Sequence, residues 1–264
     1  MERYASTGIK EIIAQFPHVA KILEEYGIGC GPCSIGICRL KDILDIHSLN
    51  KNVELELMQR IEAEIYPQRK LIVAPRATAL AQTPDASTLA APLQTLIDEH
   101  RLIKRWLALI PKLLKNLTLA DLADRQIVTQ GIDFIRSYAD RLHHGKEEEI
   151  LFASFDTSAD IFQVIYADHR RARDLVKGMA TALADGNSSK LAEHLLDYAT
   201  LLIEHIGKED GVLFPWLNNQ LGEAQRQELA AHFAKVDEDL GNDGRRYQSF
   251  IEQLEERYRT SSIN

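Results

Sequence analysis

Apolar side chains recur at helical spacing through most of the second half of the chain. Long runs rich in Leu, Ala, Ile, Glu, Lys and Arg contain few alternating apolar and polar positions and few turn residues. The connections between the runs are short, so neighbouring helices are expected to lie antiparallel and to bury their apolar stripes against one another. The pattern predicts an all-α fold, an up-down four-helix bundle followed by an extra C-terminal helix. The expected helices span 88–115, 121–153, 158–184, 188–220 and about 223–260, the last with a break near 241–244.

The first 66 residues are predicted to form a separate, smaller helical unit. Short amphipathic helices are expected up to about Tyr26 and again over 53–65. Four of the eight prolines then fall between Pro67 and Pro92, counting both ends, among Ala, Thr and Gln. Proline removes a backbone donor and disfavours helix in the residue before it, so this stretch is predicted to be an irregular linker. The predicted domains are a cysteine-containing helical domain over 1–66, a linker over 67–91 and the bundle with its C-terminal extension over 92–264.

The charge and hydropathy of the chain limit the kinds of molecule that it is expected to bind. The 264 residues are 45% hydrophobic, which is enough for a sizeable core, and 31 Lys and Arg stand against 39 Asp and Glu for a net charge of −8. Without a sustained basic run, neither nucleic acid nor an anionic membrane is an expected partner. No signal peptide or run of 18 apolar residues is present in this sequence, so we expect a soluble, cytoplasmic protein.

An internal repeat within the predicted bundle carries the candidate chemistry. The segment HHGKEEEILF, which begins at His143, aligns without a gap on HIGKEDGVLF, which begins at His205, and shares His, Gly, Lys, Glu, Leu and Phe at equal offsets. Each preceding helix holds one further histidine, which is followed by an arginine in both cases. The pattern is therefore a histidine followed by a His-x3-Glu pair, found twice. Its six members are His100, His143, Glu147, His169, His205 and Glu209.

The alignment chooses between two registers in the first copy. His144 and Glu148 have the same four-residue spacing as His143 and Glu147. Only the second pair places the two Leu-Phe tails at equivalent positions, so we take His143 and Glu147 as the functional pair. Replacement of His144 is accordingly expected to leave metal binding intact.

The spacing indicates a metal site. Residues four apart lie on one helix face, about 5–6 Å apart at Cβ, so each His-x3-Glu pair directs a nitrogen and an oxygen toward one point. Each histidine also lies in the apolar stripe of its helix, where polar groups without partners would cost several kcal/mol in total. Imidazole and carboxylate ligands favour iron, manganese or zinc. Six ligands suit two metals bridged by the glutamates, with iron as the first choice. Asp210 stays open as an alternative to Glu209, and a metal store or structural zinc protein as an alternative function.

Three cysteines, Cys30, Cys33 and Cys38, fall within nine positions at C-x2-C-x4-C spacing. We expect these thiolates to bind a second centre, an iron–sulfur cluster, because such clusters are held by cysteines and a disulfide scaffold would spread its cysteines along the chain. The fourth ligand could be His47, a water or a group from a second chain, which would make the protein a homodimer. A redox-active pair or free thiols remain the alternative, since C-x-x-C alone is a weak signal.

The six ligand candidates, their order and their Leu-Phe tails resemble the hemerythrin-like, or His-His-Glu cation-binding, family over about residues 90–220. The resemblance implies an up-down four-helix bundle with an oxo- or hydroxo-bridged non-haem di-iron centre on those six residues. Oxygen-carrying members place a second histidine four residues after the third-helix ligand, where this chain has Arg173. The chain is in this respect similar to the iron-centre repair proteins of the family, which respond to nitric oxide and oxidative damage. The segment from Phe16 to Ile28 looks like the short helical domain that precedes the bundle in those proteins.

The expected function is therefore that of an iron-handling stress protein, which repairs iron centres or reduces nitric oxide or peroxide. Its partners would be a small ligand (nitric oxide, oxygen or peroxide) and a redox partner or a damaged iron protein. With Arg173 in place of the histidine, one iron is expected to have an open or water-filled position. The alternative is a sensor, in which the di-iron site binds oxygen or nitric oxide and the N-terminal unit passes its state to a partner.

Overall fold

The computed structural model describes residues 2–28, 38–46, 49, 51–68, 89–239 and 243–260. These residues are helical apart from turns and one isolated bridge between Gly8 and Arg39, which confirms the all-α fold class. The chain divides into two compact units. One comprises 1–89, 158–164 and 208–221, and the other 90–157, 165–207 and 222–264. Most of the predicted linker over 67–91 lies outside the described residues, and the described part contains no helix long and apolar enough to cross a membrane.

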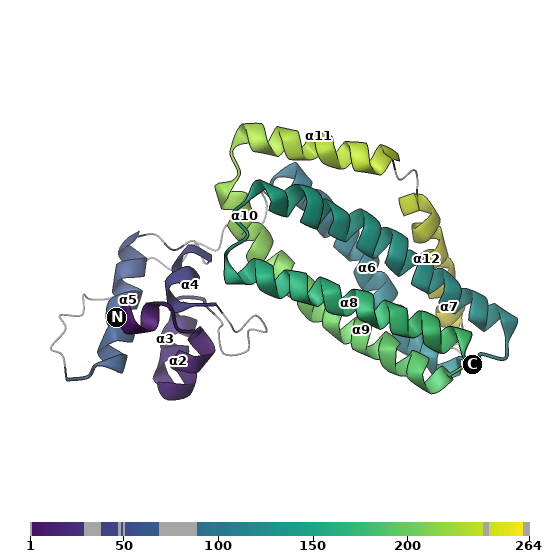
Figure 1. Ribbon diagram of the computed structural model, residues 1–264, viewed down its shortest axis with the longest axis horizontal. Coiled ribbons are helices and arrows are strands. Elements are labelled where there is room, and N and C mark those ends of the chain that lie inside the picture. Colours follow the sequence, from purple (N-terminus) through teal and green to yellow (C-terminus); the bar gives the residue numbers. More distant parts are fainter. Residues whose placement is uncertain are drawn as a thin grey trace. The chain divides into compact units, whose positions relative to one another are not determined.

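The described residues of the N-terminal part form five short helices (Figure 1). They are α1 (Glu2–Ala5), α2 (Ile9–Gln15), α3 (His18–Glu25), α4 (Leu40–Ile46) and α5 (Lys51–Ile65). Their buried apolar side chains, among them Ile12, Leu23 and Leu57, make a small core. Helix α3 ends where Gly27 adopts a φ of 76°, which allows the amide of Ile28 to donate to the carbonyl of Leu23 at 3.0 Å. This is a Schellman cap, and glycine is favoured there because it has no Cβ to oppose a positive φ. The Tyr26 hydroxyl donates to Glu56 at 2.7 Å and joins the end of α3 to α5.

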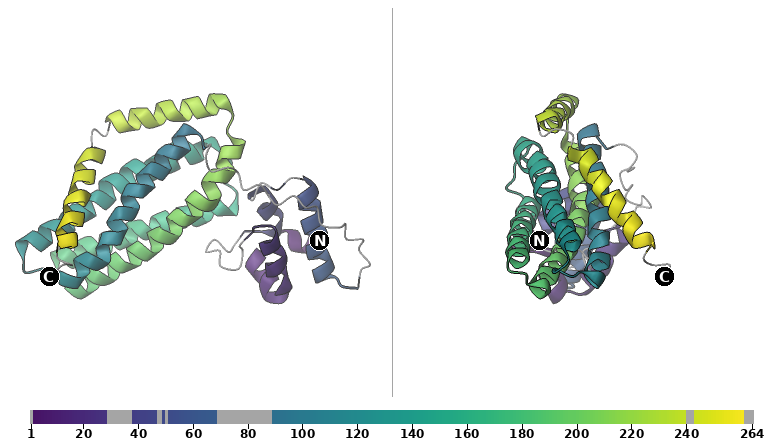
Figure 2. Two further views of the ribbon diagram at one scale, coloured as in Figure 1. Left: turned by 180° about the vertical axis from the view of Figure 1, so that it is seen from behind. Right: turned by 90° about the vertical axis from the view of Figure 1, so that its right-hand side faces the viewer.

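Four long helical runs form the bundle and lie side by side in Figures 1 and 2. They are α6 (Ala91–Asn116), α7 (Leu122–Phe134) with its continuation, α8 (Asp160–Ala184) and α9 (Ser188–Lys208) with its continuation. Asp121 caps α7, because its side chain accepts a hydrogen bond from the amide of Ala123 at 2.8 Å. Gly186, with a φ of 66°, makes the short turn between α8 and α9. The connections keep neighbouring helices antiparallel, as the sequence predicts.

Two of these runs contain π-helix. Helix α7 continues as η2 (Ile135–His144) and η3 (Lys146–Leu151), followed by the short η4 (Phe152–Ser154). Helix α9 continues as η5 (Glu209–Leu213) and then α10 (Phe214–Gln220). A π-helix has i to i+5 hydrogen bonds, so each turn holds more residues than an α-helical turn, and such segments frequently occur at functional sites. The π-helical segments overlap both copies of the His-x3-Glu repeat: η2 and η3 contain His143 and Glu147, and η5 begins at Glu209.

The final stretch forms two helices, α11 (Glu223–Asp239) and α12 (Asp243–Thr260). Helix α11 lies against α6 and η3, and α12 packs on α6 and η2. Aromatic contacts hold α12 in place: Phe250 meets Trp106 of α6 with ring centroids 5.9 Å apart, and Tyr247 meets Phe134 at 5.4 Å. The two C-terminal helices therefore cover one side of the bundle core and complete it.

Candidate metal centre

Each of the four long helical runs contributes buried histidine or glutamate side chains to one region of the bundle. None of the six side chains predicted as ligands is more than 1% exposed. They are His100 of α6, His143 in the last position of η2, Glu147 of η3, His169 of α8, His205 of α9 and Glu209 at the start of η5. Because η5 continues α9 without interruption, Glu209 follows His205 along the same helical run.

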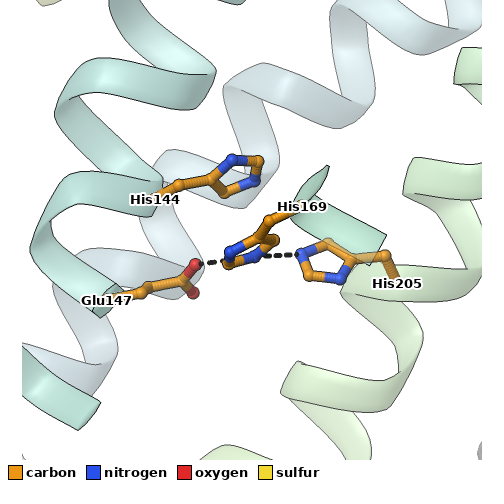
Figure 3. A group of neighbouring side chains, drawn as sticks. All are labelled: His144, Glu147, His169 and His205. Carbon is orange, nitrogen blue, oxygen red and sulfur yellow. Dashed lines mark hydrogen bonds and ion pairs between the residues drawn. The ribbon is translucent and has the colours of Figure 1, made fainter. Parts of the chain in front are cut away.

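The donor atoms fall into two groups that share one residue. Within each group, the ligand atoms all lie within 4.8 Å of one another. The first group is His144, Glu147, His169 and His205, drawn in Figure 3, and the second is His100, His143, Glu147 and Glu209. The structure thus brings all six predicted residues together and adds His144 as a seventh.

Glu147 lies between the two groups. Its Oε1 is 3.4 Å from Nε2 of His143, a member of one group, and its Oε2 is 3.5 Å from Nε2 of His169, a member of the other. Nε2 of His169 is in turn 3.2 Å from Nε2 of His205. A carboxylate with one oxygen toward each set of imidazoles has the geometry required to bridge two metal ions.

A carboxylate lies beside the Nδ1 atom of four of the histidines. Nδ1 of His143 is 2.9 Å from Glu99, and Nδ1 of His169 is 2.6 Å from Glu148. The two remaining pairs are His144 with Asp140 at 3.3 Å and His205 with Asp168 at 3.6 Å. Metal-binding histidines commonly make this contact, because it orients the ring and leaves Nε2 for the metal.

Two of these carboxyl groups, Glu99 and Glu148, have pKa values below the ordinary value for glutamate. Burial raises the pKa of Glu99, but the hydrogen bond with His143 and the charges of His143 and Lys146 outweigh it and hold the pKa below its ordinary value. Burial likewise raises the pKa of Glu148, and the contacts with His169 and Arg173 reverse the shift. Both groups are therefore maintained as carboxylates beside the imidazoles.

The donor set fits metal ions. Glu147 and Glu209 are both 0% exposed, and burying a carboxylate is costly unless a cation or hydrogen bonds compensate it. Two multivalent metal ions would compensate both carboxylates and would use the imidazole nitrogens as well. Imidazole and carboxylate donors of this kind suit iron, manganese or zinc.

Arg173 occupies the position at which oxygen-carrying hemerythrins have a further histidine. Its Nε lies 2.7 Å from Asp140 and its Nη2 lies 2.9 Å from Glu148. Both carboxylates also contact histidines of the first group, so Arg173 supports the groups around the site instead of providing a ligand. It also lines a cavity of about 350 Å³. The other lining residues are Ile135, Arg136, Asp140, His144, Ala172, Val176, Lys177 and Tyr198.

The repeat alignment predicts no role for His144, and the sequence pattern does not identify the carboxylates around the histidines. Glu99 directly precedes His100 and Asp168 directly precedes His169, so an acidic residue beside a predicted ligand was an available signal. The sequence did not reveal which histidine each of these two acidic residues contacts. Glu99 contacts His143, 44 residues away, and Asp168 contacts His205.

The cysteine prediction falls mainly outside the described residues. Cys30, Cys33 and the candidate fourth ligand His47 lie there, so the iron–sulfur prediction remains a prediction. Cys38 is described, and its side chain is buried at 8% exposure. Its backbone carbonyl accepts a hydrogen bond from the amide of Ile9 at 2.8 Å, which joins the segment before α4 to the start of α2.

These observations define a class of protein, a helical bundle whose buried histidines and glutamates can hold metal ions. Residues 91–217, just under half of the chain, match the family described as Hemerythrin HHE cation binding domain. Uncharacterized proteins of Mycobacterium bovis and of two strains of Mycobacterium tuberculosis are each 24% identical to the chain over 160 residues. The match covers 57% of this chain and 63% of each relative, which is less than two thirds of their length. No solved structure matches the chain significantly.

Proposed function

We propose that the chain is a non-haem di-iron protein that acts in the repair of iron centres or in detoxification under nitric oxide or oxidative stress. The observation that carries the proposal is that Glu147 belongs to two four-residue donor groups at once. A single metal would need only one such group. Two groups joined by a carboxylate are suited to two metals, and mixed imidazole and carboxylate ligands suit iron.

In this proposal, His169 and His205 would hold one iron and His100, His143 and Glu209 would hold the other, with Glu147 shared between the two donor groups. Bound iron would supply one-electron exchange and a position for a small ligand such as nitric oxide, oxygen or peroxide. Glu99, Glu148 and Asp168 orient the imidazoles. The donor side chains are buried, so the surrounding core would restrict the access of water to bound metals.

A route for a small ligand supports the proposal. The cavity lined by His144 and Arg173 borders the first donor group, and its volume of about 350 Å³ is ample for a diatomic molecule or peroxide. Apolar side chains such as Val176 and Ala172 form part of its wall. A small ligand in this cavity would lie beside His144, at the edge of the first donor group.

The N-terminal unit has a place in the same proposal. Its segment from Phe16 to Ile28 resembles the domain that precedes the bundle in iron-centre repair proteins, and the cysteines follow directly. We assign it the transfer of iron or electrons, through an iron–sulfur cluster or a redox-active cysteine pair, to or from a damaged iron protein or a redox partner. Anaerobic protein with inorganic sulfide would support the cluster, and three titratable thiols without sulfide would contradict it.

Metal analysis of the full chain, purified without added metal, tests the proposal. Two irons per chain, with an ultraviolet absorption of a bridged ferric pair, are the expected result. Exposure of the reduced protein to nitric oxide should then give an iron-nitrosyl spectrum and consumption of nitric oxide under reducing conditions. Zinc as the only metal would contradict the di-iron centre, and iron that is inert to nitric oxide and peroxide would contradict the stress function.

A further inference from the structure

The geometry points to His144 as a seventh metal ligand, which completes the donor group of Glu147, His169 and His205 on the side of the cavity. The inference rests on the proposed di-iron centre and assigns one of its coordination positions. The repeat alignment predicted that His143 binds metal and that His144 does not. In the structure both histidines belong to donor groups, His143 to the second and His144 to the first.

His144 has the placement that a ligand needs. It is 2% exposed, and its ring stacks on that of His169 with centroids 3.8 Å apart and an interplanar angle of 16°. Its Nδ1 lies 3.3 Å from Asp140, so Nε2 is the nitrogen with which it can bind a metal. Figure 3 shows its imidazole beside that of His169, with Glu147 and His205 close by.

The support around His144 matches that around the predicted ligands. Its Nδ1 faces a carboxylate, as does Nδ1 of His143, His169 and His205. Asp140 is itself held by Arg173 at 2.7 Å. In metal sites, the ring nitrogen that does not bind the metal commonly contacts a carboxylate, which is itself hydrogen-bonded. This contact fixes the orientation of the histidine ring.

The π-helical backbone explains how two adjacent histidines reach one centre. In an α-helix, neighbouring residues point in different directions, and only residues three or four apart share a face. His143 and His144 end the π-helix η2, just before η3 begins at Lys146. A turn with more residues brings consecutive side chains closer in direction. His143 then belongs to one donor group and His144 to the other.

The count of donors also favours this assignment. Without His144, the first group would contain three residues, whereas the second contains four. Arg173 cannot supply the missing ligand from α8, because its guanidinium remains charged and has no lone pair to donate. With His144, each donor group contains four residues, including the shared Glu147.

The position of His144 at the cavity has a consequence for external ligands. It lines the cavity of about 350 Å³ together with Arg173 and Tyr198. An external ligand that arrives by this route meets the His144 side of the centre first. The cavity is also large enough to admit free imidazole, which offers a direct test of ligation.

The test compares the full-length wild type with His144→Ala, and with His232→Ala as a matched control. His232 is an exposed histidine of α11 that belongs to neither donor group. The affinities for the two irons are measured by anaerobic competition of Fe(II) with a chromophoric chelator. We expect His144→Ala to bind one iron normally and the other at least tenfold more weakly, an effect as large as those of lost supporting contacts. Free imidazole should restore the weakened affinity, and His232→Ala should behave as wild type.

His144→Gln provides a second variant that keeps a polar side chain of similar size, and circular dichroism of the metal-free proteins reports on folding. Wild-type affinity for both irons in His144→Ala and His144→Gln would overturn the assignment. A weakened affinity that imidazole leaves unchanged would also overturn it, because the loss would then be structural. Fewer than two irons in the wild type would instead contradict the di-iron centre, so the two failures are distinguishable.

Discussion

The ammonium of Lys146 lies 2.5 Å from one oxygen of Glu99, whose other oxygen is 2.9 Å from Nδ1 of His143. Lys146 is fully buried and also contacts Asp237 of α11 at 2.5 Å. A continuous set of charged contacts therefore runs from a C-terminal helix to a predicted metal ligand. This relationship gives α11 a part in orienting His143, although α11 contributes no residue to the donor groups.

Replacement of Lys146 by Met should lower both stability and metal affinity. Removing one partner of a buried ion pair leaves the other charge buried, which costs about 3–5 kcal/mol. His143 would lose the support of a fixed Glu99, and we expect about a ten- to hundredfold weaker affinity for one metal. Chemical unfolding and metal competition measure the two effects. Lys177→Met is the control, since Lys177 is exposed and forms an exposed ion pair with Asp174 three residues earlier. Equal effects of the two substitutions would contradict the assignment.

Three consecutive glutamates offer a graded comparison at the centre. Glu147 belongs to both donor groups, Glu148 contacts His169 at 2.6 Å, and Glu149 is exposed. Glu147→Gln should abolish binding of the metal pair, Glu148→Gln should weaken it about ten- to hundredfold, and Glu149→Gln should leave it unchanged. Metal analysis after gel filtration ranks the three variants. Two tightly bound metals in Glu147→Gln would show that Glu147 is not the bridge.

The pKa of Glu255 provides a pH-dependent prediction for the packing of α12. Hydrogen bonds from Arg105 at 2.9 and 2.8 Å hold the pKa of Glu255 below its ordinary value, against the opposing effect of burial. A lowered pKa means that the pair stabilises the fold above the unfolded-state pKa and that this contribution is lost as pH falls through the folded-state pKa. Because the pair is partly exposed, its contribution at neutral pH should be at most about 1 kcal/mol.

Carboxyl NMR of selectively labelled protein measures this shift. The titration midpoint of Glu255 should lie below its ordinary value in the wild type and should rise toward that value in Arg105→Ala. A midpoint that does not respond to Arg105→Ala would assign the shift to another cause.

Two glycines differ in their tolerance of a side chain. A Cβ at Gly131 of α7 would overlap the ring of Trp106, whereas a Cβ at Gly207 of α9 would meet no atom within 4 Å. Gly131→Ala should therefore destabilise the bundle by about 1–3 kcal/mol through overpacking. Gly207→Ala should be neutral or stabilise it by up to about 1 kcal/mol, because alanine has the higher helix propensity. The free energies of unfolding of the two metal-free variants are measured by thermal and chemical denaturation. A Gly131→Ala variant as stable as wild type, together with a destabilised Gly207→Ala variant, would contradict this packing.

The sequence alone was sufficient to predict the helices of the bundle and the six residues that the structure gathers. Helix periodicity is local, so the apolar stripes containing His100 and His169 could be recognised without knowledge of their neighbours. The His-x3-Glu spacing is also local, and its repetition at Glu147 and Glu209 indicated a shared site before any contact was known.

Only the tertiary structure decided how the residues around those six are arranged. An α-helical period of 3.6 does not reveal a π-helical turn, so the approach of His144 to the first donor group could not be predicted from spacing. The pairing of Arg173 with Asp140 and Glu148, and of Lys146 with Glu99, joins residues that lie between 25 and 47 positions apart. Such contacts depend on how whole helices pack, because the partner of a buried charge is set by the helix that faces it and not by its neighbours in the chain.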